Sequence, residues 1–545
     1  MIITPLQSFL QWEKETPEKT FLRQPIQGTW HVYTYASAGG QVRRIATALR
    51  KLDLPRHSKI AILSKNCAHW LMADLAIMMA GFVSVPVYPT LSASGIKEIL
   101  DHSEASAIFL GKLDNFEIQK PGLPEGIIQL SFPHYGVTTG LLWEKLVNEN
   151  EPLIAISPPA PESLATIMYS SGTTGTPKGI MLTHGAFGFV GDCVRRHLGI
   201  TKPERFFSYL PLSHIAERAL MEMVALSSGS SVSFAESLDK FQQNLQHERP
   251  TIFGGVPRIY AKFQEGILQK LPQRKLDRLL SIPFVNNLIR KKIRSKLGLA
   301  EARVIVSGAA PTPSSLLHWF KKLAIPIREI YGMTENTAFS HANFREIRIG
   351  TVGQPWPEVE AKLSDDGEIL VRHKALMTGY FNDPETTSKV FTNDGFLKTG
   401  DQGSIDSQGF LTIIGRVKDQ FKTDKAKFVA PAPIEMRLLS NPDLEQVCVV
   451  GMGLPQPIAL VVLTAAAKGR NRQEIASGLS KTVDTINQDL EHYEQLEKAV
   501  ILPEGWTLEN GLLTPSLKIK RNEIERMYLT KYKHWYDQKP LVIWD

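Results

Sequence analysis

The chain has 545 residues, too many for one ordinary hydrophobic core, so we expect two or more domains. Apolar residues make up 43% and charged residues 21%, which is ordinary for a soluble globular protein. The formal net charge of +7 is small against 62 basic and 55 acidic side chains. It gives no reason to expect nucleic-acid binding and supports only a mild preference for anionic substrates or surfaces.

The cysteines and the N-terminal residues indicate the compartment. Cys67, Cys193 and Cys448 lie far apart and form no Cys-x-x-Cys pair, which indicates a reducing environment and no zinc site. The first residues, "MIITPLQSFLQWEKETPEK", lack the basic start and apolar centre of a secretion signal, so a cytoplasmic location is expected. Cys193 is expected to pack in a core and not to act as a nucleophile.

The pattern from Lys59 onward predicts a strand, a helix and a second strand. Its apolar part, residues 70–88, carries Asp74, Gly81 and Pro86, which favours a buried helix and a strand over a membrane span. Similar strand and helix patterns begin at Thr251 and at Arg303, the latter with a helix opened by Pro313 and Ser314. Three such units predict an α/β body with largely parallel sheets, whose ligands sit at the carboxyl ends of strands.

The later part of the chain changes in character. Residues about 345–415 contain short strands separated by turns, including Asp366-Gly367, and predict a β-rich module. Beyond it, two strands, a helix from Arg472 to about Tyr493 and a strand near residues 498–502 predict a small α+β domain. We therefore expect an N-terminal domain of residues 1–417 and a C-terminal domain of residues 418–545.

The stretch "YSSGTTGTPKGIMLTH", residues 169–184, has the composition of a phosphate-binding loop. It does not match the P-loop of nucleotide-hydrolysing proteins, because Pro177 stands at the second glycine position and Gly179 follows Lys178. Backbone donors and Lys178 suit the phosphates of a nucleotide, although a flexible surface loop has a similar composition.

Several motifs, taken together, resemble one family. "YSSGTTGTPKG", "YGMTE", "GYFNDPETT", "DGFLKTGD", "GRVKDQFK" and "LTPSLKIKR" resemble, in order and approximate spacing, the core motifs of the adenylate-forming superfamily. That superfamily includes acyl-CoA synthetases, luciferases and peptide-synthetase adenylation domains. "YLPLSHIAER", "GGVPRIYAKF", "SGAAPTP" and "FKTDKAKFVAPAPIE" look most like long-chain fatty acyl-CoA synthetases.

The resemblance implies a role for each matching residue. The ATP phosphates would be held by Ser170, Ser171, Gly172, Thr173, Thr174, Gly175 and Lys178, and Mg²⁺ by Thr173 and Glu335. The adenine slot would comprise Gly308, Ala309, Ala310, Tyr331, Gly332 and Met333, with Thr334 on the α-phosphate. Asp401 and Arg416 would take the ribose. Lys418 would be the hinge of a mobile small domain, Lys422 would line the cofactor site, and Lys518 would reach the reacting oxygens.

The sequence departs from the long-chain pattern at two places. Ala426 stands where most such enzymes have glycine beside the pantetheine path, which puts the thiol step in doubt more than adenylation. Either free CoA or the phosphopantetheine arm of an acyl carrier protein then remains as acceptor. The residues Ser516-Leu517-Lys518 also differ from the Ser-Gly-Lys that is common at this motif, so Lys520 is a rival for the role of Lys518.

Other residues have two interpretations each. By resemblance His214 lines the acyl or thiol channel, but a lone His beside apolar residues is also typical of a core. Phe253 and Gly254 either border a fatty-acid tunnel or pack at a strand end, and Glu217 and Arg218 could pair with each other. Residues 283–298 form a basic helix with one apolar face. It either rests peripherally on the inner face of an anionic membrane or packs with a solvated face.

We therefore expect Mg²⁺- and ATP-dependent activation of a fatty acid to acyl-AMP, then acyl transfer to CoA. A carrier-protein ligase and an aryl-acid ligase are alternatives within the same chemistry. A non-catalytic lipid- or nucleotide-binding protein and a nucleotide hydrolase are alternatives of other classes.

Overall fold

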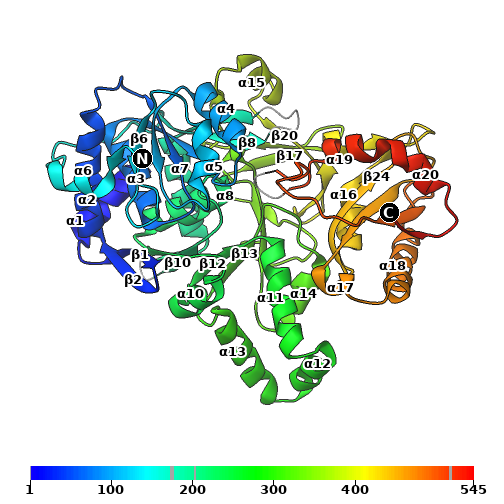
Figure 1. The fold of residues 1–545 in the computed structure, drawn as a ribbon. Coiled ribbons are helices and arrows are strands. Elements are labelled where there is room, and N and C mark those ends of the chain that lie inside the picture. Colours follow the sequence, from blue (N-terminus) through cyan, green and yellow to red (C-terminus); the bar gives the residue numbers. More distant parts are fainter. Residues whose placement is uncertain (1, 172–176, 202–203, 515–517) are drawn as a thin grey trace.

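The computed structural model describes residues 2–171, 177–201, 204–514 and 518–545, apart from the side chain of Ser171. A large N-terminal body precedes a smaller C-terminal part that lies at one side of it (Figure 1). The α/β fold class predicted from the sequence is confirmed, with mostly parallel sheets in the large body and an α+β C-terminal part.

A first sheet of the large body has the order β19-β9-β8-β4-β3-β5-β6-β7. In that order its strands are Gly379–Tyr380, Pro177–Thr183, Leu164–Ser171, Val83–Val87, Lys59–Leu63, Ala105–Leu110, Ile128–Ser131 and Leu141–Leu142. Strands β8, β4, β3, β5, β6 and β7 run parallel to one another, while β9 pairs antiparallel with β8, and β19 pairs antiparallel with β9.

The predicted unit at Lys59 is confirmed as β3, helix α3 (Ala68–Ala80) and β4, with β3 and β4 parallel. Ten apolar residues, His69 and Asp74 are buried in α3, so the helix is covered on all sides, as its near-continuous apolar sequence requires. The helix ends at Gly81, whose φ of 87° is the left-handed conformation that favours glycine. No helix among the described residues is long and apolar enough to cross a bilayer.

A second sheet has the order β16-β15-β14-β13-β12-β10-β11-β1-β2. Its strands are Gln354–Pro355, His341–Ala342, Arg328–Tyr331, Val304–Ser307, Ile252–Gly255, Arg205–Ser208, Ser231–Phe234, Thr20–Ile26 and Thr29–Thr34. The predicted unit from Arg303 is confirmed: β13, helix α14 (Ser314–Lys322) and a parallel β14. The unit from Thr251 is β12 followed by α11 (Pro257–Lys270).

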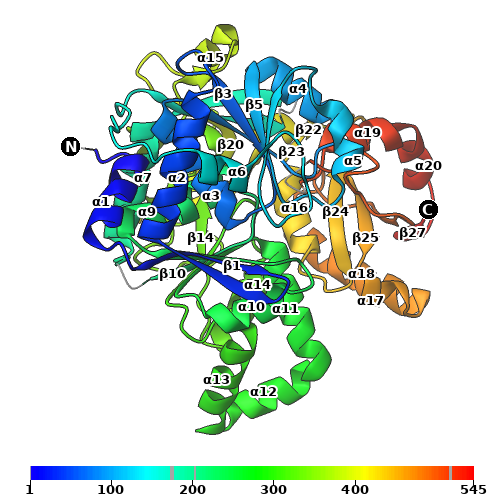
Figure 2. The same ribbon diagram turned by 60° about the vertical axis from the view of Figure 1, so that its left-hand side comes forward.

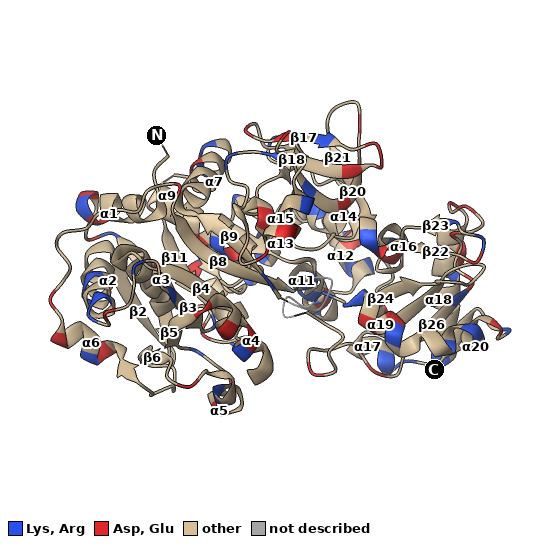
Figure 3. Ribbon diagram, turned by 90° about the horizontal axis from the view of Figure 1, so that it is seen from above, with Lys and Arg blue, Asp and Glu red and all other residues tan. Residues whose placement is uncertain are grey.

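Helices cover these sheets and link their strands (Figures 1 and 2). They are α1 (Pro5–Glu15), α2 (Tyr35–Arg50), α4 (Ala93–Ser103), α5 (Phe116–Gln119), α6 (Trp143–Glu149), α7 (His184–His197), α8 (Ile215–Glu217), the π-helix η2 (Arg218–Met223), α9 (Val224–Ser228), α10 (Phe241–Glu248), α12 (Gln273–Ser281), α13 (Val285–Leu297) and α15 (Pro384–Val390). Basic and acidic residues alternate along helices such as α4 and α19 (Arg521–Tyr528), as the colours of the ribbon in Figure 3 show.

The predicted β-rich module is an antiparallel sheet of β17 (Glu360–Leu363), β18 (Glu368–Arg372), β20 (Leu397–Ile405) and β21 (Leu411–Arg416). The predicted turn at Asp366-Gly367 joins β17 to β18, and Gly367 adopts a φ of 76° there. The one-turn helix η4 (Val417–Asp419) then leads out of the module into the C-terminal part.

The C-terminal part contains a small hairpin and a four-stranded sheet with the order β24-β25-β26-β27. Its elements are β22 (Phe421–Lys422), β23 (Phe428–Val429), α16 (Pro431–Leu438), β24 (Leu444–Val450), β25 (Ile458–Leu463), α17 (Ala465–Lys468), α18 (Arg472–Asn487), β26 (Lys498–Ile501), α19, η5 (Leu529–Lys531), α20 (Tyr532–Tyr536) and β27 (Val542–Trp544). The prediction of a helix to about Tyr493 was wrong, because α18 ends at Asn487. The Asn487 side chain bonds both backbone groups of Leu496 and turns the chain toward β26.

Hydrophobic clusters separate the two parts. Within the described residues, clusters of the large body draw on positions 6–411, whereas those of the C-terminal part draw on positions 421–543. Separate cores support the proposed division into domains at Lys418. Helix α16 packs against β21 at the boundary, where the Ala432 methyl group lies against Gly415. The Arg258 guanidinium also contacts the Glu445 carboxylate at 2.6 Å across the boundary.

Candidate functional site

The predicted phosphate-binding stretch lies on the hairpin of β8 and β9. Ser170 pairs with Lys178 and Ser171 with Pro177 at its end. The predicted phosphate-binding residues Gly172, Thr173, Thr174 and Gly175 lie outside the described residues. The Lys178 ammonium lies over the Tyr380 ring, 4.9 Å from its centroid. Lys178 is therefore held at the edge of the first sheet by an aromatic face.

Tyr380 joins Lys178 to the predicted metal-binding acid. Its hydroxyl donates to Oε1 of Glu335 at 3.0 Å, and burial together with the Glu335 charge raises the pKa of Tyr380. The Glu335 carbonyl also accepts from the Met377 amide at 2.8 Å. The ring of one residue thus connects the phosphate loop with the "YGMTE" motif.

The "YGMTE" motif ends β14 and continues as the one-turn helix η3 (Thr334–Asn336). The Asn336 side chain accepts from the Met333 amide at 2.8 Å, and the Thr337 hydroxyl donates to the Ala375 carbonyl at 2.6 Å. A Cβ on Gly332 would collide with the Ala338 backbone, so this close turn requires glycine. These contacts fix Thr334 and Glu335 at the carboxyl end of β14, where both keep partial exposure.

Asp401 lies between two partners that the sequence also singled out. The Tyr331 hydroxyl donates to its Oδ2 at 2.6 Å, and Nε of Arg416 lies 2.8 Å from its Oδ1. The pairing is built into the module, because Asp401 on β20 stands directly opposite Arg416 on β21. Burial raises the pKa of Asp401, while Arg416 and Tyr331 oppose that rise.

The residues predicted to form an adenine slot lie at one edge of the second sheet. Gly308, Ala309 and Ala310 follow β13, and Tyr331 ends the neighbouring parallel strand β14, so both segments reach the same strand ends. Gly308 packs closely on Ile330, and Ala309 has a φ of 66°. Ala310 is exposed, so the segment is open to solvent next to Tyr331.

Lys518 belongs to the C-terminal part but reaches the site of the large body. The Lys518 amide donates to the Thr514 hydroxyl at 3.1 Å, and the Lys518 carbonyl accepts from the Thr514 amide at 2.8 Å. Crowding by protein atoms lowers the pKa of the Lys518 ammonium, Arg416 lowers it further, and Asp401 and Glu335 oppose that change. Lys518 nevertheless remains open to solvent. Its rival Lys520 precedes α19 as the N-cap residue.

His214 lies within electrostatic reach of Lys518. It is the N-cap of α8, and its Nδ1 accepts from the Ala216 amide at 3.2 Å. Burial, reinforced by the nearby Lys518 charge, lowers the pKa of His214 to about 3. The imidazole is therefore neutral near pH 7 and acts there as a polar group of fixed orientation.

Arg218 and Glu217 do not pair with each other, contrary to one interpretation of the sequence. Arg218 bonds both oxygens of Asp74, at 2.6 and 2.8 Å, deep in the large body. Glu217 instead accepts from the Tyr209 amide at 3.1 Å, and burial raises its pKa to about 8. The reason lies in the chain direction, since consecutive helical residues point to different faces.

Lys418, Lys422 and Ala426 are not brought to this group. Lys418 lies exposed in η4 and Lys422 exposed on β22, with its ammonium 4.8 Å from the centroid of the Phe428 ring. Ala426 occupies the turn between β22 and β23, exposed and with a φ of 58°. Alanine thus adopts the left-handed conformation for which glycine is better suited, at a cost of about 1–2 kcal/mol.

Phe253 and Gly254 lie in a packed aromatic region. The Phe253 ring stacks on Tyr209 at 5.8 Å and contacts Phe263, and the Tyr209 hydroxyl donates to the Gly254 carbonyl at 2.9 Å. A Cβ on Gly254 would collide with the Met221 side chain. Both residues are part of a core in this arrangement, and a fatty-acid channel along them stays a prediction.

Cys67, Cys193 and Cys448 are all buried. Burial is the first cause that raises the pKa of the Cys193 thiol, to about 12, and the Glu358 carboxylate adds to it. A buried thiol that stays protonated is unsuited to nucleophilic catalysis, which agrees with its expected packing role.

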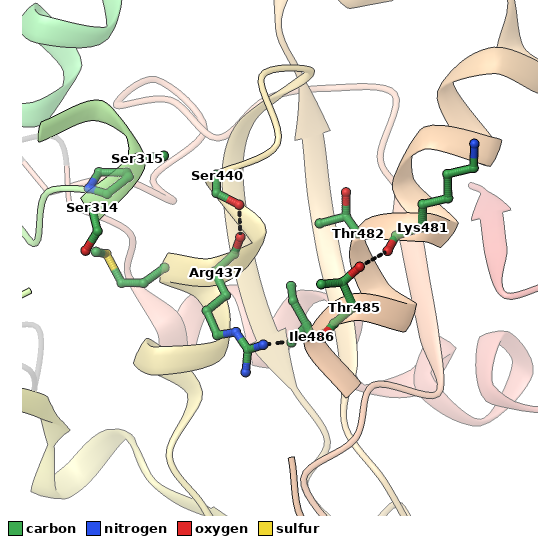
Figure 4. A pocket seen from close by; sticks show the side chains of 10 residues that line it. Ser314, Ser315, Arg437, Ser440, Lys481, Thr482, Thr485 and Ile486 are labelled. Carbon is green, nitrogen blue, oxygen red and sulfur yellow. Dashed lines mark hydrogen bonds between the residues drawn. The ribbon is translucent and has the colours of Figure 1, made fainter. Parts of the chain in front are cut away.

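Two cavities lie near these elements. One of about 260 Å³ is lined by Lys178, Tyr380, Phe381 and Asp383 among others, beside the phosphate loop. A larger one of about 470 Å³ lies between α14 of the large body and α16 and α18 of the C-terminal part (Figure 4). Its described lining contains Arg437 and Lys481 but none of the predicted site residues, so it is separate from the candidate site.

The residues around Glu335 fit a magnesium ion that is held mainly by a substrate. The described residues contain no group of three or more His, Cys, Asp or Glu arranged to hold a metal. Mg²⁺ is commonly held by one or two carboxylates together with substrate phosphates, and the partly exposed Glu335 suits that arrangement. Its predicted companion Thr173 lies outside the described residues.

Tyr380 is the residue that sequence reasoning missed. It was quoted only within "GYFNDPETT", and no role was given to it. The available signal was the aromatic ring directly after Gly379, in a motif that the resemblance had already marked. Its importance depends on the pairing of β19 with β9, which brings residues 380 and 180 together.

Comparisons with known proteins identify the family of the chain. The family model described as AMP-binding enzyme matches residues 9–381, and the model described as AMP-binding enzyme C-terminal domain matches residues 418–540. The chain is 29% identical to a long-chain-fatty-acid–CoA ligase of Mycobacterium bovis, over 97% of this chain and 96% of that protein. It is 31% identical to the peroxisomal long chain acyl-CoA synthetase 7 of Arabidopsis thaliana, over 93% of this chain and 82% of that protein.

A solved structure shares the whole fold. The crystal structure of an anthranilate CoA ligase in complex with anthranoyl-AMP superposes with a TM-score of 0.81, covering 97% of this chain and 98% of the other. At a sequence identity of 20%, this agreement concerns the fold and not the function.

Proposed function

The chain belongs to the adenylate-forming superfamily of AMP-binding enzymes and is similar to long-chain acyl-CoA synthetases, and from this premise we propose that it joins a fatty acid to CoA. The carboxylate first reacts with ATP to give acyl-AMP and pyrophosphate. The acyl group then passes to the CoA thiol and AMP leaves.

The observation that carries this proposal is the position of Lys518. A lysine of the small domain shares an electrostatic environment with Glu335, Asp401 and Arg416 of the large domain. A non-catalytic binding protein has no need to bring a mobile cation from a second domain to a group of acids. An adenylation site needs such a cation, because negative charge accumulates on the α-phosphate during attack.

In the first half-reaction a carboxylate oxygen bonds to the α-phosphorus, and the bond from that phosphorus to the pyrophosphate oxygen breaks. No general base is needed, because the acid is ionised near neutral pH. Lys178 and the phosphate loop hold the leaving pyrophosphate, while Lys518 offsets charge on the α-phosphate oxygens. Mg²⁺ held with Glu335 would supply further positive charge at the phosphates.

Nucleotide binding involves the Tyr331, Asp401 and Arg416 group. The ribose hydroxyls replace the Tyr331 hydroxyl at Asp401 or share the carboxylate with it, and Arg416 keeps that carboxylate ionised. Adenine lies against the open Gly308 to Ala310 segment beside Tyr331. Thr334 stands next to Glu335 and donates to the α-phosphate.

In the second half-reaction the thiol sulfur bonds to the acyl carbon, AMP leaves, and the thiol proton passes to solvent. The small domain turns at Lys418 so that the β22–β23 turn with Lys422 and Ala426 replaces Lys518 at the site. This step requires a rearrangement, because in the present arrangement it is Lys518 whose charge interacts with Asp401 and Glu335. His214 stays neutral and lines the channel through which the thiol arrives.

A long-chain fatty acid is the proposed substrate, and the cytoplasm the proposed location. Both curated relatives act on long-chain fatty acids by name, and the aromatic region around Phe253 offers an apolar wall for an alkyl chain. An aryl acid is the alternative substrate, because an aryl-acid ligase has the same fold.

A panel of acids tests the proposal. Fatty acids of graded length and aryl acids are supplied with ATP and Mg²⁺, and AMP release and acid-dependent pyrophosphate exchange are measured. The products are compared with free CoA, with a phosphopantetheinylated carrier protein and with neither. Long-chain acids with CoA should give acyl-CoA, AMP and pyrophosphate.

Other products would replace the proposal. Exchange without a thioester from CoA, but with one on the carrier protein, would make the chain a carrier ligase. ADP and phosphate as products would indicate nucleotide hydrolysis.

A further inference from the structure

Helices α12 and α13 project together from the large body as a hairpin, which we call the α12–α13 hairpin, residues 273–297 (Figures 1 and 2). Its root is anchored: the Trp319 indole donates to the Gln273 side chain at 2.8 Å, and Ile293 and Leu297 are buried. Arg290 and Arg294 donate to carbonyl groups at the end of α14, at Lys322 and Ala324. The far end, residues 281–284, is exposed.

The far end carries apolar side chains in water. Phe284 is 86% exposed, Leu288 68% and Ile282 42%. The apolar face expected along residues 283–298 is therefore divided, because Ile293 and Leu297 pack while Phe284 and Leu288 do not. Neither simple interpretation of this helix was complete: it packs at one end and presents apolar groups at the other.

The backbone at this tip is strained as well. Phe284 has a φ of 66° and precedes α13 as its N-cap residue without a side-chain cap. A bulky residue in this region is a true outlier, and such positions cost on the order of 1–3 kcal/mol. Strain and exposure at one residue both destabilise the isolated chain, and glycine would avoid both.

The hairpin concentrates the positive charge of the protein. Residues 273–297 contain eight Lys or Arg residues and one acid, Asp277, so their net charge of +7 equals that of the whole chain. The rest of the protein is therefore electrically balanced. Arg290 and Arg294 anchor the root, which leaves these exposed cations: Arg274, Lys275, Arg278, Lys291, Lys292 and Lys296.

The exposed cations stand next to the apolar tip. Lys291 and Lys292 follow Leu288 by three and four residues, so all three share one face of α13. Arg278 precedes Ile282 by four residues on the other arm. Apolar groups at a tip with cations one turn behind match the layering of a lipid surface, where acyl chains lie beneath anionic headgroups.

We propose that the α12–α13 hairpin docks this enzyme on an anionic phospholipid bilayer. Phe284, Leu288 and Ile282 enter the boundary between headgroups and acyl chains, and the exposed lysines and arginines bind the headgroups. The root of the hairpin continues from α11, which follows the aromatic region of Phe253 directly in sequence. Docking therefore brings the lipid phase close to the proposed acyl-binding region.

Vesicle flotation of the full chain tests the proposal. Neutral phosphatidylcholine vesicles are compared with vesicles in which part of that lipid is replaced by phosphatidylglycerol, at low and high salt. The protein should bind the anionic vesicles but not the neutral ones, and salt should weaken this binding. Phe284→Ser with Leu288→Ser should weaken it about tenfold, since each ring or branched chain leaves water on insertion. Lys291→Gln with Lys292→Gln should weaken it on the order of twentyfold.

Matched controls separate docking from general effects. Ile154 is 88% exposed elsewhere on the large domain, so Ile154→Ser removes an exposed apolar side chain outside the hairpin and should leave vesicle binding unchanged. Lys14→Gln with Lys539→Gln removes the same charge outside the hairpin and should weaken vesicle binding by less than about threefold. Thermal unfolding and pyrophosphate exchange with a water-soluble acid should match the wild type in all variants, because the hairpin lies outside the adenylation site.

The proposal is overturned if the wild type ignores anionic vesicles, or if the hairpin variants bind them as the wild type does. Binding to single-stranded DNA as strong as to vesicles, dependent on Lys291 and Lys292 but indifferent to Phe284, would also overturn it. The hairpin would then be a general polyanion contact. Because flotation needs no turnover, its outcome is independent of the substrate proposed above.

Discussion

The small domain carries two lysine-bearing segments, one at Lys518 and one at the turn between β22 and β23, and they differ in their surroundings. Crowding by protein atoms, reinforced by Arg416 of the large domain, lowers the pKa of the Lys518 ammonium, while the charges of Asp401 and Glu335 oppose that change. The turn that contains Ala426 is exposed and contacts its own domain, as where Lys427 lies over the Tyr493 ring at 5.9 Å. One domain thus carries two surfaces for one site. Under the proposed function, this arrangement suits the first half-reaction.

The variant Lys518→Ala tests this difference between the two lysine-bearing segments most directly. Removing the cation should lower ATP–pyrophosphate exchange on the order of 10²- to 10³-fold, because charge on the α-phosphate loses its mobile partner. Thioester formation from supplied acyl-AMP should stay within about threefold of the wild type. Lys520→Ala is the control and should leave exchange unchanged. If Lys520→Ala abolishes exchange and Lys518→Ala does not, the two residues exchange roles.

The alkaline limb of the pH profile sharpens the same contrast. The pKa of Lys518 is lowered, so its ammonium is present below that pKa and lost as pH rises through it. Exchange should fall about tenfold per pH unit above the lowered pKa, starting below the range of an ordinary lysine. Thiolation of supplied acyl-AMP should not share this limb. Identical alkaline limbs for the two half-reactions would separate the pH dependence from Lys518.

Ala426→Leu probes the other turn. A bulky side chain beside the pantetheine path should slow thiolation of supplied acyl-AMP on the order of fivefold, since about 1 kcal/mol of crowding corresponds to that factor. Pyrophosphate exchange should not change, because the turn is exposed while adenylation takes place.

Ala426→Gly is the matched control for that variant. It relieves the left-handed backbone but loosens the unfolded chain, so its stability should stay within about 1 kcal/mol of the wild type. Thermal unfolding measures this. Equal loss of both half-reactions in Ala426→Leu would mean that the turn acts through folding and not through the thiol path.

The smallest effect is expected at the contact between Arg258 and Glu445. This pair joins the two domains at 2.6 Å but both side chains are largely exposed, so it contributes at most about 1 kcal/mol. Arg258→Ala should change the ratio of the two half-reaction rates by less than about fivefold. High salt should produce the same change in the wild type and none in the variant. A larger effect would make the contact a main determinant of the domain arrangement.

Sequence reasoning succeeded where the signal was local. The apolar run after Lys59 predicted β3, α3 and β4, and the Asp366-Gly367 turn predicted the hairpin of the β-rich module. The resemblance assigned both Asp401 and Arg416 to the ribose but did not predict that they pair. Their pairing follows from the position of the two residues on adjacent antiparallel strands joined by a short turn.

It failed where distant residues decide the outcome. Arg218 binds Asp74, 144 residues away, so its neighbour Glu217 gave a false clue. The end of α18 depends on bonds from Asn487 to Leu496, which the helical periodicity does not contain. The role of Tyr380 requires β19 to pair with β9, and no property of the "GYFNDPETT" motif alone reveals that partner.

The Asp401 carboxylate, already shared between Tyr331 and Arg416, has a consequence for nucleotide selectivity under the proposed function. A ribose that binds there gains only the difference between its own hydrogen bonds and the one that Tyr331 gives up. A sugar that lacks a hydroxyl cannot complete this exchange and leaves a buried acceptor without its donor. The site thus selects against deoxynucleotides, because their sugar makes fewer hydrogen bonds with Asp401 than are needed to offset the loss of the Tyr331 bond. This selectivity needs no steric barrier.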